Sequence, residues 1–231
     1  MKRAVIPELL DTDSSTPAEI AAFLSDLRRI NHWFGGVATT QVMVEYVAQK
    51  IGVKAFSVLE VAAGAGDVPQ AVREKLERSG IQLEVSLLDR ASSHLRNGSN
   101  GMPAVTGNGL ALPFADASFD LVSCCLFAHH LAPEELVRFV NEALRVSRVA
   151  VLINDLVRHP AHLALVYAGW PLYRSRLTQH DAPASVRQAY TVAEMRNMLR
   201  QTPAAGVVVR RHFLLRMGVV VWNYGCWNAA R

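Results

Sequence analysis

The run VLEVAAGAGDVP, Val58 to Pro69, joins an apolar strand pattern to an acidic residue, Glu60, and a loop with Gly64 and Gly66. Small residues in such a loop let backbone amides and a flat polar ligand approach closely. A P-loop would need Gly-Lys followed by Ser or Thr, and a GxGxxG dinucleotide turn would place glycine where Pro69 stands. The loop therefore predicts a ligand site that fits neither of these two phosphate motifs.

Two further polar residues follow the next apolar runs. Asp89 ends the run LLDR, and a carboxylate there can accept two hydrogen bonds from the vicinal hydroxyls of a ribose. The segment GNGLALPFADASFD adds Asn108, whose amide could face an adenine edge. Each feature alone is typical of an ordinary turn, but together and in this order they predict a nucleoside-binding site.

These residues need an alternating arrangement of strands and helices to bring them together. We expect strands at 56–61, 82–88, 104–106, 120–127 and 150–154, with helices at 67–79, near 91 and at 133–146. This alternation implies parallel strands with both sheet faces covered. The last run, GVVVRRHFLLRMGVVVW, holds two β-rich segments without a helix between them and predicts an antiparallel pair. The predicted fold class is a doubly wound α/β sheet finished by a hairpin.

Helical segments flank this core. Capping boxes at Thr16 and Thr191 predict helices that begin there, and a second early helix is expected at 39–51. Residues 158–188 are expected to be helical with loops. We predict one domain, 1–231, with an N-terminal helical cap (1–52), a cofactor-binding core (53–157), a lid or acceptor insertion (158–190), and a C-terminal helix and hairpin (191–231).

Composition narrows the class of protein. Of 231 residues 51% are hydrophobic and 19% charged, as in globular chains, and no apolar run is long enough to span a membrane. The N-terminus lacks the apolar region of a secretory signal, so a cytoplasmic location is expected. The net charge of +4 comes from interspersed basic residues, which argues against a nucleic-acid partner. Cys124, Cys125 and Cys226 are interpreted as reduced core thiols.

From about Val58 to Asp155 the sequence resembles the class I S-adenosylmethionine-dependent methyltransferases. The first motif of that family has an acidic residue and three glycines at alternate positions, which here are Glu60, Ala62, Gly64 and Gly66. The blocks ALPFADASFDLV (111–122) and LFAHHL (126–131) resemble the ubiquinone/menaquinone and small-molecule, polyketide-type branch. The resemblance implies a seven-stranded Rossmann-like sheet, S-adenosyl-L-methionine as cofactor and S-adenosyl-L-homocysteine as product.

Two positions depart from the family pattern. Ala62 replaces a glycine, which is tolerable if its φ is negative, and Asn108 replaces the usual aspartate but can still accept from the adenine amino group. Trp33 either packs between helices or offers its ring to the sulfonium or the acceptor. The resemblance implies these cofactor-binding residues: Glu60, Ala62, Gly64, Gly66, Asp89, Arg90, Asn108, Gly109, Leu110, Leu126 and Trp33.

Candidate proton acceptors lie beyond the carboxyl end of the sheet. His129 and His130 follow the fourth strand, and one of them is a candidate general base, with a structural or cofactor-contact role as the alternative. No metal is expected, because no acidic or histidine ligand recurs at zinc spacing nearby.

The polar region 173–191 is either a solvated surface loop or a lid over the acceptor. In a lid, His180 would act as base with Asp181 as its orienting partner, and Arg176 or Arg187 would hold an acidic or phenolate acceptor. Asp155 and Tyr190 are further candidates for acceptor binding.

These features predict methyl transfer to a small-molecule acceptor, to the oxygen of a phenolic or polyketide-like compound. Carbon or nitrogen acceptors remain open, and a homodimer is possible. An NAD(P)-dependent oxidoreductase is a second class, which Pro69 and the antiparallel ending disfavour. A non-catalytic cofactor-binding scaffold is a third, for which Ala62 is the only hint.

Overall fold

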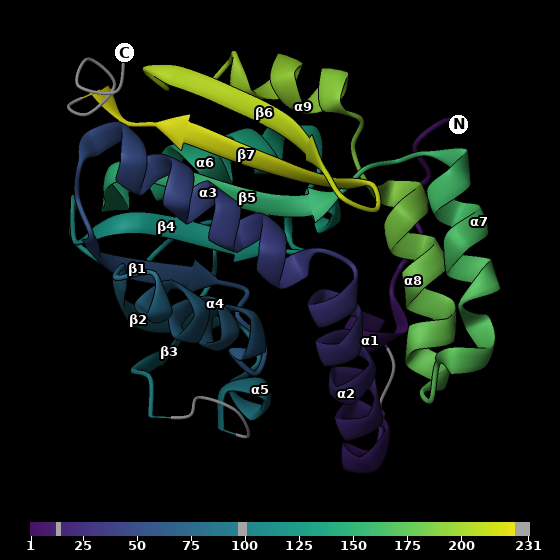
Figure 1. Ribbon diagram of the computed structural model, residues 1–231. Coiled ribbons are helices and arrows are strands. Elements are labelled where there is room, and N and C mark those ends of the chain that lie inside the picture. The colour runs from purple at the N-terminus through teal and green to yellow at the C-terminus, as the bar shows by residue number, and fades with distance from the viewer. Residues whose placement is uncertain (13–14, 97–100, 225–231) are drawn as a thin grey trace.

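The structure, a computed structural model, describes residues 1–12, 15–96 and 101–224, and within them a seven-stranded sheet has the order β3-β2-β1-β4-β5-β7-β6 (Figure 1). The parallel strands are β1 to β5, and β7 pairs antiparallel with both β5 and β6. This confirms the predicted α/β class with its terminal hairpin. The strands are β1 (Ala55–Val61), β2 (Gln82–Asp89), β3 (Ala104–Thr106), β4 (Phe119–Cys125), β5 (Ser147–Leu156), β6 (Gly206–His212) and β7 (Arg216–Trp222).

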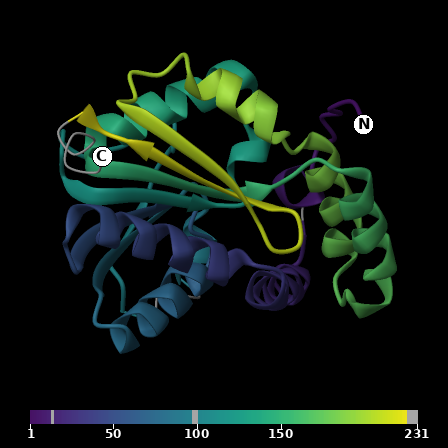
Figure 2. The same cartoon turned by 45° about the horizontal axis from the view of Figure 1, so that its top comes forward.

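Helices cover both faces of the sheet (Figure 2). Apolar side chains of α3 (Gly36–Ile51), α4 (Asp67–Arg78) and α5 (Ser92–Arg96) form one core cluster with the sheet. Those of α6 (Pro133–Val146) and α9 (Val192–Leu199) form the other. The central strands are thus buried on both sides, as their continuous apolar runs require.

A third group of helices lies beyond the carboxyl ends of the parallel strands (Figure 1). It consists of α1 (Leu9–Thr12), α2 (Pro17–Trp33), α7 (Pro160–Ala168), α8 (Arg176–Gln188) and two 3-10 turns, η1 (Ala128–His130) and η2 (Trp170–Leu172). Ligands of open α/β sheets bind at this edge, so these helices frame the candidate site. No described helix is both long and apolar enough to cross a membrane.

Several element boundaries differ from the expectation. Strand β4 stops at Cys125 because Leu126 has a left-handed φ of 58°, which turns the chain toward η1. Helix α3 begins at Gly36 because Gly35, with φ 83°, forms its N-cap. Of the three cysteines, Cys124 and Cys125 are free thiols, and Cys226 lies outside the described residues.

Candidate active site

The glycine loop after β1 contacts the carboxylate that ends β2. Strands β1 and β2 are parallel neighbours, so their carboxyl ends meet. The Gly64 amide donates to Asp89 Oδ2 at 2.8 Å, and the Ala91 amide donates to Oδ1 at 2.8 Å. Burial would raise the pKa of Asp89, but His94 and these two amides outweigh burial and lower it. Asp89 is therefore a charged acceptor at the edge of the loop.

The loop itself is built from left-handed residues. Gly64 and Gly66 have φ of 54° and 75°, and a Cβ placed on Gly64 would meet nothing within 4 Å. Ala62 also has a positive φ, 55°, so the condition under which an alanine would be tolerated here without strain is not met. The chain must turn sharply where β1 ends, and the alanine adopts a conformation that costs roughly 1–2 kcal/mol for a residue with a Cβ.

Glu60 lies one position from the end of β1, beside Ser123 of β4. Its side chain is buried, and burial raises its pKa to about 7. A cationic group close by would favour the ionised form, as nearby opposite charge does for any carboxyl. Because its pKa lies near neutral pH, Glu60 can be either protonated or ionised there.

The loop after β3 closes against the ends of β1 and β4. A Cβ on Gly109 would lie 3.0 Å from Val61 and 3.3 Å from Phe127, so a larger residue would require these two side chains to move. Asn108 is exposed, and its Oδ1 accepts from the Leu110 amide at 3.0 Å. The Asn108 oxygen that was predicted to accept from adenine therefore already accepts a hydrogen bond within this turn.

The four loops after β1 to β4 therefore lie along one edge, as the order of motifs predicted. Arg90 is exposed directly after β2, Leu110 packs partly against the core, and Leu126 makes the turn after β4. These placements are compatible with cofactor contact, which for each residue stays a prediction.

The junction of α2 and α3 lies beside the same edge. Arg28 pairs with Asp67 at 2.9 Å and so links α2 to the first turn of α4, directly after the glycine loop. Trp33 is 60% exposed, which disagrees with the packing alternative and leaves its ring available to a ligand.

A buried arginine holds this junction in place. Arg216, at the start of β7, donates to Asn31 Oδ1 at 2.8 Å and to the Phe34 carbonyl at 3.1 Å. Sequence reasoning missed Arg216, because a lone arginine in a β-rich run gives no sign of a partner in the first helices.

His129 does not have the environment of a general base. Its Nδ1–H donates to Asp155 Oδ1 at 2.7 Å, and its Nε2 lies 3.6 Å from Glu8 Oε1. Burial would lower the pKa of His129, but the two carboxylates outweigh burial and raise it to about 10. This environment favours the structural alternative for His129, because both ring nitrogens face carboxylates.

Asp155 is likewise occupied. Its buried carboxylate also accepts from the amides of His129 and Leu156, which favours a structural role over acceptor binding. His130 stays partly exposed, with Nε2 at 3.8 Å from Glu8 Oε2. Glu8 escaped sequence reasoning because it comes from the N-terminal segment, far along the chain from both histidines.

The predicted His180–Asp181 pair forms in α8. The His180 Nδ1–H donates to Asp181 Oδ1 at 2.9 Å, and 41% of the His180 side chain is exposed. Asp181 is buried and also accepts from the Leu9 and Leu10 amides of α1. The carboxylate is thereby fixed, and it fixes the orientation of the imidazole.

Segment 173–191 is not a solvated loop, because α8 buries one face that includes Leu177, Ala184 and Val186. Arg176, which was predicted to hold an acidic or phenolate acceptor, pairs with Glu19 at 2.6 Å. This ion pair links α8 to α2.

Tyr190, a predicted acceptor-binding residue, is likewise engaged within the protein. It is buried, its hydroxyl donates to the Leu131 carbonyl at 2.6 Å, and the Arg3 guanidinium stacks on its ring. Arg187 is half-buried and donates to the Tyr167 hydroxyl at 2.8 Å, and its role in acceptor binding stays a prediction.

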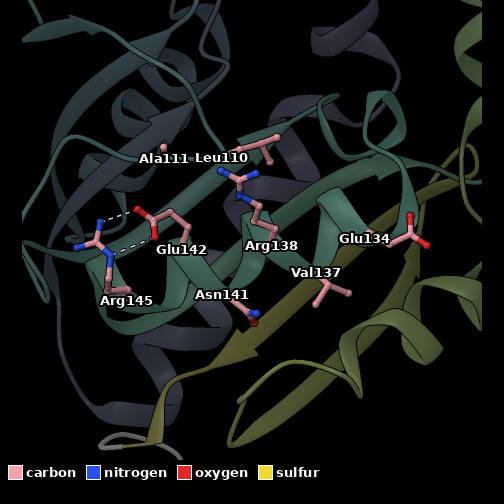
Figure 3. Close-up of a pocket in the computed structure, with 8 residues that line it drawn as sticks. All are labelled: Leu110, Ala111, Glu134, Val137, Arg138, Asn141, Glu142 and Arg145. Atoms are coloured by element: carbon pink, nitrogen blue, oxygen red, sulfur yellow. Dashed lines mark hydrogen bonds and ion pairs between the residues drawn. The ribbon is translucent and has the colours of Figure 1, made fainter.

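The hollow drawn in Figure 3, of about 500 Å³, lies elsewhere. It is formed by the outer face of α6 and residues 110–111, and the ion pair of Arg145 with Glu142 at 2.6 Å borders it. The loops after β1 and β2 do not contribute to this hollow, so it is not part of the candidate active site.

Comparison with known proteins agrees with this geometry. A family model described as a methyltransferase domain matches residues 58–149. The ubiquinone/menaquinone biosynthesis C-methyltransferase UbiE of Hahella chejuensis is 27% identical over 201 residues, which are 78% of this chain and 78% of the relative. The enzyme of the same name from Roseobacter denitrificans is 32% identical over 118 residues, covering 47% of this chain and 43% of the relative.

Solved structures share the fold. A SAM-dependent methyltransferase from Aquifex aeolicus has a TM-score of 0.62 at 18% identity, covering 90% of this chain and 99% of that one. The plantazolicin methyltransferase BpumL in complex with SAH has a TM-score of 0.68 at 12% identity, covering 93% of each chain. Residues 58–149 thus match a methyltransferase domain, and the chain as a whole is similar in sequence and in fold to methyltransferases that use S-adenosylmethionine.

Proposed function

We propose that the protein transfers the methyl group of S-adenosylmethionine to the oxygen of a phenolic or polyketide-like small molecule. The observation that carries this proposal is the His180–Asp181 pair. Asp181 holds the Nδ1–H of His180 at 2.9 Å, and among the described residues Nε2 has no hydrogen-bond partner. An imidazole oriented by a carboxylate, with its second nitrogen open, is the arrangement of a general base.

The residues along the sheet edge fit the cofactor. The charged Asp89 would accept from the ribose hydroxyls, and the open space at Gly64 would admit the amino-acid tail. Glu60 lies near the expected position of the cationic end, which would favour its ionised form. Each of these is a group of this chain whose charge or space matches a part of S-adenosylmethionine.

Methyl transfer from a sulfonium is an in-line displacement, so the protein chiefly aligns the acceptor atom, the methyl carbon and the sulfur. Such alignment supplies roughly 7–11 kcal/mol. A phenolic acceptor also has a proton to lose, and His180 would accept it while Asp181 stabilises the imidazolium that forms. In this mechanism the loops at the sheet edge and the surrounding helices align the reacting atoms, and His180 of α8 removes the proton.

Aromatic side chains near the helices of the third group favour a flat acceptor. Tyr167 and Trp170 stack with ring centroids 5.9 Å apart, and both are exposed, as is Trp33. Arg187 donates to the Tyr167 hydroxyl and adds a positive charge that suits a phenolate. Sites for small molecules are lined mainly by apolar and aromatic side chains with a few polar groups, and these residues supply both kinds.

Carbon methylation is the second candidate, because both curated relatives are named C-methyltransferases. The same base would serve it, since a phenol that is methylated on a ring carbon also benefits from deprotonation. The two reactions differ in the acceptor atom that faces the methyl group, and a product analysis separates them.

The test incubates the protein with methyl-labelled S-adenosylmethionine and a panel of phenols, quinol precursors and amines, and the products are analysed by NMR. We expect O-methyl products, and a fall in kcat of roughly 10²–10⁴ for His180→Gln with little change in the KM for the cofactor. His32→Gln, an exposed histidine on α2, is the matched control. Label found only on ring carbon or on amines would exclude the oxygen assignment.

A further inference from the structure

We propose that Glu8, His129 and His130 form a binding site for a divalent transition-metal ion. One carboxylate oxygen of Glu8 and one ring nitrogen of each histidine all lie within 4.8 Å of one another. Glu8 comes from the segment directly before α1, and the histidines come from η1 after β4. The inference is independent of the acceptor proposed above.

The distances suit an ion better than direct hydrogen bonds. His129 Nε2 lies 3.6 Å from Glu8 Oε1, and His130 Nε2 lies 3.8 Å from Oε2. Both exceed the roughly 3.2 Å that an N–H···O bond spans. Metal–ligand bonds of about 2.1 Å at tetrahedral angles separate ligand atoms by about 3.4 Å, and the two separations between Glu8 and the histidines lie within a few tenths of an ångström of that value.

The ligands are already oriented by second partners. The Nδ1–H of His129 donates to Asp155 Oδ1 at 2.7 Å, which leaves Nε2 directed toward Glu8. A carboxylate behind a ligating histidine is the usual outer partner in metal sites. Glu8 Oε1 accepts from the Ser185 hydroxyl at 2.6 Å and from the Gln188 amide at 2.8 Å. Residues of β5 and α8 therefore hold the side chains of His129 and Glu8 in place.

The donor set selects the class of ion. Two imidazoles and one carboxylate suit zinc, iron(II), cobalt or manganese, whereas calcium and magnesium prefer oxygen ligands throughout. Three protein ligands leave at least one position open, as in metal sites that bind water or a substrate oxygen. Because 30% of the His130 side chain is exposed, the open position is reachable from solvent.

The location links the ion to the N-terminal segment. The amides of Leu9 and Leu10, which follow Glu8, donate to Asp181 of α8. An ion at Glu8 would thus tie this segment to η1, next to the point where α1 contacts the His180–Asp181 pair.

In the test, metal is first removed from the full chain with a chelator. The protein is then titrated with Co²⁺, followed by visible absorption, and separately with Zn²⁺, followed by calorimetry. We expect one equivalent of each to bind, with Co²⁺ bands of nitrogen and oxygen ligands and without a thiolate charge-transfer band. Glu8→Gln and His130→Ala should each lower the affinity at least tenfold. His32→Ala and Cys125→Ser should leave the affinity unchanged.

Absence of stoichiometric binding to the wild-type chain would overturn the proposal. So would wild-type affinity in both Glu8→Gln and His130→Ala. Should Glu8→Gln fail to fold, His130→Ala decides, because His130 is partly exposed and its replacement leaves the buried His129–Asp155 pair intact.

Discussion

Glu60 should make the stability of the cofactor-free protein fall as the pH rises from about 4.5 to about 7. Burial raises the pKa of Glu60 from 4.5 to about 7 in the folded chain. In this interval the native state binds more protons than the unfolded state, so the free energy of unfolding decreases with pH. A difference of about 2.5 pKa units at 1.36 kcal/mol each corresponds to about 3 kcal/mol.

Glu60→Gln isolates this contribution, because the amide keeps the size of the side chain and has no charge to gain. We expect the variant to gain about 3 kcal/mol relative to wild type between pH 4.5 and pH 8, with most of the change complete near pH 7. The measurement is urea unfolding of both proteins at half-unit pH steps.

Glu77→Gln, an exposed position on α4, controls for the general effect of removing a carboxylate. A difference between wild type and Glu60→Gln that stays constant within about 0.5 kcal/mol across this range would refute the argument that burial controls the ionisation of Glu60.

Three other substitutions test the loops at the sheet edge. Asp89→Asn should weaken S-adenosylmethionine binding about 10- to 100-fold by calorimetry, because hydrogen bonds to a charged group contribute about 1.5–3 kcal/mol. Ala62→Gly should raise the free energy of unfolding by about 0.5–1 kcal/mol, since relief of the left-handed φ of 55° exceeds the added entropy of the unfolded chain. Gly109→Ala should lower it by about 1–3 kcal/mol, because the new Cβ would lie 3.0 Å from Val61.

Each of these has a result that would contradict it. Unchanged cofactor affinity in Asp89→Asn would remove the ribose assignment. A less stable Ala62→Gly protein would mean that the backbone at this position is not strained, and unaltered unfolding of Gly109→Ala would mean that the loop after β3 shifts without cost.

Local sequence patterns determined most of the fold. Apolar runs without helical periodicity became β1, β2 and β4, and the capping boxes at Thr16 and Thr191 start α2 and α9 as expected. These signals are local, because a cap or a strand pattern is complete within a few residues. The order of the loops after β1 to β3 also followed, since parallel strands bring their carboxyl ends to one edge.

Backbone conformation at single positions did not follow from local pattern. Ala62 and Leu126 adopt left-handed φ values that residue type disfavours, because the ends of β1 and β4 must turn into tightly packed loops. The packing of the whole edge imposes these angles.

Charge partners were decided by tertiary structure alone. His129 and Asp155 looked like candidates for chemistry, yet the fold buries them together and adds Glu8 from the N-terminal segment. Arg216 likewise contacts Asn31 across a separation of 185 residues. Spacing along the chain predicts which residues share a helix face or a strand end, but the protonation and availability of a side chain depend on neighbours that only the folded chain brings together.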